Sequence, residues 1–170
     1  WTTALKAAAP AQRFAVYLAQ REQHGTAPSF YLDCADFFLS VKDEATALQV
    51  LSNIAELRLD DPALLRVLAH RLAQLEQLST AARLFEVVLR LRPEEPQSHR
   101  DLALVLGRRA DKQASTIAAR ADWQAALDHL AAIVKRRWDR FEAIEIIALT
   151  ELNGLWPKAK AAGATLPLDA

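Results

Sequence analysis

The chain has 170 residues, of which 52% are hydrophobic and 25% charged, and its 21 lysines and arginines balance 21 aspartates and glutamates. This composition is typical of a folded globular protein and excludes an intrinsically disordered chain. The balanced charge excludes the overall basic field of nucleic-acid-binding domains, and no apolar run reaches the ~20 residues of a transmembrane helix.

Residues 1–27 are predicted to form an N-terminal partial repeat. A short entry segment precedes a helix over residues 10–24, and Gly25 follows as a residue suited to a helix C-terminus. The chain begins at Trp1 and contains no methionine, so we expect a fragment of a longer protein or a processed product.

Residues 28–61 and 62–95 are predicted to be two complete helix–turn–helix repeats. Pro28, Pro62 and Pro96 are equally spaced along the chain, and proline is tolerated in the first turn of a helix. Seven positions after each proline stands a small residue that favours a close crossing of two helices. These small residues are Ala35, Ala69 and Ala103. The four helices are expected over residues 28–41, 44–59, 62–75 and 80–91.

Residues 96–140 are predicted to be a third repeat with an insertion at about 108–122. The insertion follows from Ala126, which a strict period would place at position 115. The eleven inserted residues amount to about three helical turns. The sequence therefore predicts either that one or both helices of this hairpin are prolonged, or that an exposed loop lies between them.

Residues 141–162 are expected to form a capping helix that covers the last apolar face, with Ile144, Ile147 and Ala148 at packing positions. Residues 163–170 are expected to be an exit linker. The spacing of the three prolines is the 34-residue period of the tetratricopeptide repeat (TPR). We therefore predict one all-α domain over residues 1–170, a TPR-like α-solenoid of stacked antiparallel helix hairpins with a C-terminal capping helix.

The sequence shows no pattern that indicates catalysis. It has no Gly-rich phosphate loop, HExxH or CxxC motif, and we predict no enzyme activity, no catalytic or metal-binding residue and no cofactor. Cys34 falls on a packing position and is expected to be a buried structural thiol. His99 also falls on a packing position, where a half-buried, hydrogen-bonded side chain is expected.

In a TPR stack the first helix of each hairpin lines a concave groove. Seven polar side chains are predicted to project into this groove, and we call them the groove residues. They are Asp36, Arg66, His70, Gln74, Gln97, Arg100 and Arg108. The arginines are suited to bind carboxylates, because a guanidinium group forms paired hydrogen bonds with them. Two interpretations stay open: the groove binds an acidic segment, or its charges are solvated or paired within the chain.

Residues 30–38, 51–57, 92–98 and 138–142 resemble the TPR segment of a group of large bacterial proteins. Proteins of that group also carry a vault/inter-alpha-trypsin (VIT) domain, a von Willebrand A-type domain and a C-terminal β-rich domain. The resemblance implies an exported protein of the cell envelope or periplasm, and it implies no catalytic residues for this segment.

Two functions are consistent with these observations. The first is a protein–protein interaction module of a larger envelope protein, whose partner is a protein or peptide, acidic ones included. The second is a rigid architectural spacer packed against neighbouring domains of its own chain. Neither involves nucleic acid or direct insertion into a membrane.

Overall fold

A computed structural model describes most of the chain, and the described residues are 1–57, 61–113, 116–138, 141 and 143–167. These residues form nine α-helices and one short 3-10 helix, and none of them lies in a β-strand. The predicted all-α class is therefore confirmed. The chain divides into two compact units, Trp1–Leu75 and Glu76–Ala170.

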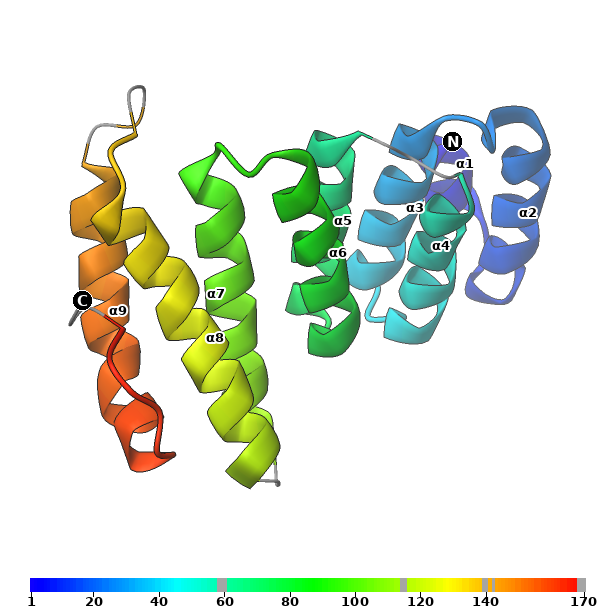
Figure 1. The fold of residues 1–170 in the computed structure, drawn as a ribbon. Coiled ribbons are helices and arrows are strands. Elements are labelled where there is room, and N and C mark those ends of the chain that lie inside the picture. Colours follow the sequence, from blue (N-terminus) through cyan, green and yellow to red (C-terminus); the bar gives the residue numbers. More distant parts are fainter. Residues whose placement is uncertain (58–60, 114–115, 139–140, 142, 168–170) are drawn as a thin grey trace. The chain divides into compact units, whose positions relative to one another are not determined.

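The first unit contains five α-helices among its described residues, with α3 and α4 side by side as an antiparallel hairpin (Figure 1). In chain order its elements are α1 (Thr2–Ala7), the 3-10 helix η1 (Pro10–Gln12), α2 (Arg13–His24), α3 (Pro28–Ser40), α4 (Glu44–Glu56) and α5 (Pro62–Gln74). The helices expected in this unit are present, and their described ends lie within three residues of the predicted ends.

Local features of the first hairpin recur one repeat period later in the chain. The turn after α3 places Lys42 at a positive φ of 63°, and Glu76 has a φ of 59° in the turn after α5. Asp43 then caps α4, since its Oδ1 accepts a hydrogen bond of 3.1 Å from the Thr46 N–H. Proline occupies the first turn of α3, α5 and α7. The sequence period thus corresponds to recurring helix starts and turns.

Aromatic side chains form the core of the first unit. Tyr17 on α2 stacks on Phe30 of α3 with ring centroids 5.7 Å apart. The buried Tyr17 hydroxyl accepts a hydrogen bond of 3.1 Å from the amide of Asn53 on α4. Ala35 and Ala69 are 1% and 0% exposed, which confirms the predicted packing role of the small residues.

Glycine is required at position 25 because there is no room for a Cβ atom, and not because of the backbone conformation. Gly25 directly follows α2 as expected, and its φ is −65°, a value that residues other than glycine also adopt. A Cβ atom at Gly25 would lie 2.6 Å from the carbonyl oxygen of Arg21 and 3.0 Å from the hydroxyl of Tyr31. The same hydroxyl donates a 2.8 Å hydrogen bond to the Gly25 carbonyl. Glycine therefore allows α3 to approach the end of α2.

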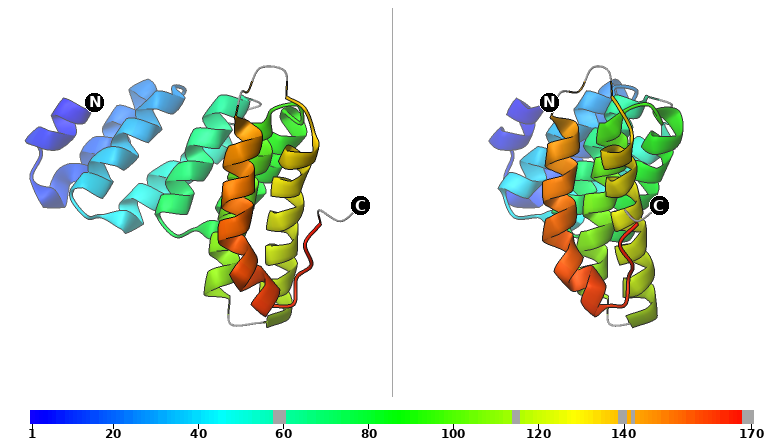
Figure 2. Two further views of the ribbon diagram at one scale, coloured as in Figure 1. Left: turned by 90° about the vertical axis from the view of Figure 1, so that its left-hand side faces the viewer. Right: turned by 60° about the vertical axis from the view of Figure 1, so that its left-hand side comes forward.

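The second unit contains four helices among its described residues: α6 (Leu78–Leu91), α7 (Pro96–Lys112), α8 (Thr116–Lys135) and α9 (Ile144–Ala161). Each helix packs against the next one along the chain, and Figure 2 shows α7, α8 and α9 side by side. The core between them is largely aliphatic. Its most deeply buried members include Phe85, Ala103, Leu127, Leu130, Ile133 and Leu152.

The insertion in the third predicted repeat lengthens both helices of the hairpin. α7 has 17 residues against 13 in α3, and α8 has 20 against 13 in α4. These four and seven extra residues account for the whole insertion. Of the two open alternatives, the prolonged helices are confirmed.

The last helix differs from expectation in two respects. It begins at Ile144, after Ala143 in a left-handed conformation, rather than at residue 141, and it continues through Pro157 to Ala161. Ile144 and Ala148 are buried as predicted, but Ile147 is 44% exposed and Ile146 is 68% exposed. An apolar strip of α9 thus remains in contact with solvent. None of the described helices combines the length and apolar character that a membrane span requires.

Candidate functional site

Three polar side chains of the first unit form a connected cluster across α3 and α5. The guanidinium of Arg71 donates a 2.8 Å hydrogen bond to the carboxylate of Asp36 and a 3.1 Å hydrogen bond to the amide oxygen of Gln74. Asp36 and Gln74 are two of the groove residues. Arg71 is not a groove residue, although it directly follows His70, which is the equivalent of Asp36 in the next repeat.

The other two groove residues of the first unit also lie on α5. Arg66 is half-buried and His70 is exposed. His70 is therefore the more accessible of the two to a partner.

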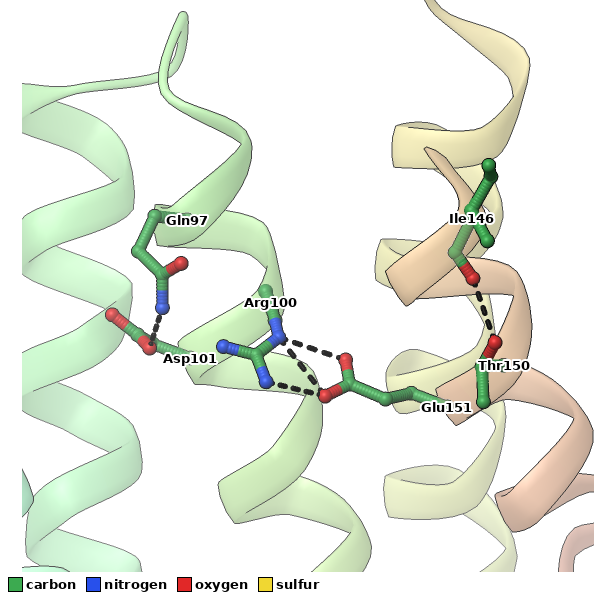
Figure 3. Close-up of polar contacts among 6 residues, drawn as sticks. All are labelled: Gln97, Arg100, Asp101, Ile146, Thr150 and Glu151. Atoms are coloured by element: carbon green, nitrogen blue, oxygen red, sulfur yellow. Dashed lines mark hydrogen bonds and ion pairs between the residues drawn. The ribbon is translucent and has the colours of Figure 1, made fainter. Parts of the chain in front are cut away.

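In the second unit, Arg100 of α7 is bound by a carboxylate of the chain itself. Its guanidinium donates hydrogen bonds of 2.9, 2.9 and 2.5 Å to the two carboxylate oxygens of Glu151 on α9 (Figure 3). The two side chains are 29% and 20% exposed. The hydrogen bonds to Glu151 raise the pKa of Arg100, and the ion pair links α7 to α9.

The remaining two groove residues of the second unit also have partners within it. Gln97 donates a 2.6 Å hydrogen bond to Asp101 on the next turn of α7 (Figure 3). Arg108 donates a 3.1 Å hydrogen bond to Glu76, which also accepts one of 2.5 Å from Lys112. These contacts lower the pKa of Glu76, and the hydrogen bond from Lys112 is the largest cause.

The ion pairs reduce the positive charge that the predicted groove can offer to an acidic partner. Arg100 and Arg108 were expected to present positive charge to an acidic partner, yet each already lies against a glutamate. A ligand carboxylate would have to displace Glu151 or Glu76. Displacing Glu151 is the more costly of the two, because it holds Arg100 through three hydrogen bonds in a half-buried position.

A histidine pair joins α7 to α8 in the second unit. The Nδ1 atoms of His99 and His129 lie 3.2 Å apart, so one ring must donate and the other accept a hydrogen bond. Burial lowers the pKa of both imidazoles. The nearby Arg136 further lowers that of His99, while a hydrogen bond to the Pro93 carbonyl opposes the shift. The predicted half-buried, hydrogen-bonded state of His99 is confirmed.

The expected burial of Cys34 is also confirmed. Its side chain is fully buried on α3, and burial raises the pKa of the thiol to about 12. A thiol of this kind is a poor nucleophile, because only the thiolate reacts. Within the part of the chain that the structure describes, no group of three or more His, Cys, Asp or Glu side chains is arranged to hold a metal ion.

Comparison with known proteins adds no assignment to these sites. No protein-family model matches the chain, and no curated protein is significantly similar to it in sequence.

Proposed function

We propose that the chain is a TPR-like repeat array that serves as a non-catalytic protein–protein interaction module in a larger bacterial envelope protein. One observation supports this proposal most directly: a proline recurs at equal intervals, each time in the first turn of a helix. A buried alanine and, in two turns, a left-handed residue recur at the same interval. Helix arrays of this period expose a continuous surface of side chains, and partners bind there.

The groove residues best placed to meet a partner are those that are exposed. Asp36 on α3 and His70 and Gln74 on α5 are exposed in the first unit, and Arg108 on α7 is exposed in the second. Polar, accessible side chains on a helix are suited to hydrogen-bond a bound peptide or domain. We therefore place the partner contacts on these residues rather than on Arg100.

The test is affinity capture from an envelope extract with the unaltered chain and with a His70→Glu/Arg108→Glu variant at equal concentration. A control variant carries Arg83→Glu and Arg90→Glu, two positions on α6 outside the groove residues. We expect a protein that the unaltered chain and the control retain and the groove variant loses. Equal retention by all three, with melting curves showing that each folds, would contradict the proposal.

A second candidate function, the architectural spacer, is favoured by a different observation. Ile146, Ile147 and Leu149 on α9 are 68%, 44% and 39% exposed, and such an apolar strip suits packing against another domain of the same polypeptide. The spacer predicts that Ile146→Lys in the longer protein lowers its melting temperature. The interaction module predicts that this substitution leaves both the melting temperature and partner capture unchanged.

A further inference from the structure

A polar cavity lies where the loop between α6 and α7 meets the segment that follows α8. It is an open hollow of about 450 Å³, and its walls combine arginines, glutamates and two aromatic rings. The α6–α7 side contributes Arg92, Glu94 and Glu95, and the segment after α8 contributes Arg136, Arg137, Trp138 and Phe141. None of these is a groove residue, so the cavity is a separate site.

The floor of the cavity is held in place by contacts on several sides of Trp138. The indole N–H donates a 2.9 Å hydrogen bond to the carbonyl of Ile133, and the side chain is only 8% exposed. The ring of His99 meets the indole in a T-shaped contact with centroids 6.0 Å apart. A ring fixed in this way is a rigid support for the side chains that lie over it, and a preformed site lowers the entropic cost of binding.

Arg136 lies over this floor in a cation–π contact. Its guanidinium carbon is 4.7 Å from the centroid of the Trp138 ring. A guanidinium stacked on an aromatic ring keeps the N–H groups at its edge available for a carboxylate. The contact therefore orients Arg136 without consuming its hydrogen-bonding capacity.

The charges of the cavity are only partly balanced. Arg92 is 3.9 Å from both Glu94 and Glu95, which is beyond hydrogen-bond length. Arg136 and Arg137 are both exposed, and neither forms an ion pair with another described residue. This differs from Arg100 and Arg108, whose guanidinium groups lie against glutamates.

We propose that this cavity binds an acidic peptide segment. A carboxylate of the peptide pairs with Arg136 and Arg137, and an adjacent aromatic or aliphatic side chain packs on Phe141, which is 39% exposed. A free inorganic anion uses the arginines alone, whereas a peptide also fills the apolar wall. The proposal concerns a site apart from the groove residues and does not depend on the function proposed for them.

The probe is a fluorescein-labelled peptide, Gly-Glu-Phe-Glu-Glu-Gly, titrated with the 170-residue chain and followed by fluorescence anisotropy. The matched peptide replaces each glutamate with glutamine. We expect saturable binding of the acidic peptide and binding weaker by at least about tenfold for the glutamine peptide. Absence of saturable binding, or equal affinity for the two peptides, would overturn the proposal.

Variants then locate the bound peptide. Arg136→Glu/Arg137→Glu is expected to weaken binding by at least about tenfold, and Arg137→Glu alone tests the same point without touching the contact with Trp138. The control variant, Arg83→Glu/Lys135→Glu, changes the net charge equally at exposed positions outside the cavity. Equal loss in the control would show attraction by net charge only and would refute the site.

Inorganic phosphate and a Phe141→Ser variant separate a peptide from a simple anion. We expect phosphate to displace the peptide only at concentrations far above the dissociation constant of the peptide, and Phe141→Ser to weaken peptide binding. Displacement by phosphate at the same concentration as unlabelled peptide, with no effect of Phe141→Ser, would mean a general anion site and would contradict the proposal.

Discussion

The hairpins α3–α4 and α7–α8 begin in the same way and end differently. Each first helix has proline in its first turn and a buried alanine seven residues later, Ala35 in α3 and Ala103 in α7. The first hairpin closes after 13 residues with a three-residue turn, whereas α7 runs for 17 residues and α8 for 20. The period fixes how a hairpin starts but does not fix how long it is.

The longer hairpin has its own packing in the added part. Asp122 near the start of α8 accepts hydrogen bonds of 2.7 and 2.6 Å from the guanidinium of Arg109 and one of 2.6 Å from the amide of Gln113. Ala110 and Ala119, in the same part of the hairpin, are buried at 3% and 8% exposure. Added helical turns persist only if they bury surface or satisfy polar groups, and these turns do both.

Trp123 gives the largest expected effect in this comparison. When α8 is aligned with α4 so that Ala126 matches Ala47, Trp123 matches Glu44. Trp123 is nevertheless buried, with 3% of its surface exposed, whereas Glu44 is exposed. Trp123→Ala should lower the free energy of unfolding by about 3–5 kcal/mol, because it leaves a large cavity. Glu44→Ala should change it by less than about 0.5 kcal/mol. Urea unfolding followed by circular dichroism measures both.

Similar costs for the two substitutions would contradict the comparison, because they would mean that the part of α8 next to the added turns contributes no more to the core than the start of α4 does. Gly107, which lies close to Trp123, allows a second test of the packing at this position. A Cβ at Gly107 would lie 3.4 Å from the Trp123 ring and from Leu155. A bulky substitution such as Gly107→Val should therefore also destabilise the second unit.

Asp122 tests the polar part of the longer hairpin. Asp122→Ala removes the acceptor of Arg109 and Gln113 and should cost about 2 kcal/mol, since hydrogen bonds to charged groups contribute about 1.5–3 kcal/mol. The exposed pair of Lys158 with Asp111 is the control, with side chains 60% and 44% exposed. Asp111→Ala should cost less than about 1 kcal/mol. A loss for Asp122→Ala no larger than that of the control would show that the added turns do not depend on this cluster.

The histidine pair predicts a pH dependence that the first hairpin does not share. Folding lowers the pKa of His99 and His129 below their ordinary value of 6.5, so the unfolded chain binds protons more readily. The contribution of the pair to stability is complete above pH 6.5 and is lost as the pH falls through the lowered pKa values. Because both rings are half-buried, we expect a smaller effect than for Asp122→Ala.

The measurement compares the unfolding free energy at several pH values, from slightly alkaline to mildly acidic, for the unaltered chain and for His99→Gln/His129→Gln. Acidification should destabilise the unaltered chain more than the variant, because glutamine does not titrate. Parallel pH profiles of the two proteins would exclude a role for the pair. The neighbouring charged groups Arg136 and Asp128 are present in both proteins and cancel in the difference.

The sequence predicted those features that a repeat encodes locally. The starts of α3, α5 and α7 and the burial of their alanines follow from proline, small residues and helical periodicity, whereas the sequence left both prolonged helices and an exposed loop open for the insertion. The ion pair of Arg100 with Glu151 could not be predicted, because its partners are far apart in the sequence and meet only through the placement of α9. The exposure of Ile147 has the same origin, since periodicity marks an apolar face but not what covers it.

The smallest expected effects come from two of the ion pairs that the groove residues form, Asp36–Arg71 and Arg100–Glu151, and the difference between them is itself a prediction. Asp36–Arg71 has side chains 46% and 36% exposed, whereas Arg100–Glu151 is 29% and 20% exposed and is bidentate. A double-mutant cycle to alanine should give a coupling of about 0.5 kcal/mol for the first pair and about 1.5 kcal/mol for the second.

Salt sharpens this contrast, because solvent ions screen exposed charges far more than half-buried ones. Raising the salt concentration to about 1 M should abolish the coupling of Asp36 with Arg71 and leave most of that between Arg100 and Glu151. Equal couplings at low salt, both lost at high salt, would show that Glu151 holds Arg100 no more firmly than a surface charge does. In that case Arg100 would be available to a partner carboxylate, and the proposed groove would again be a candidate site for an acidic ligand.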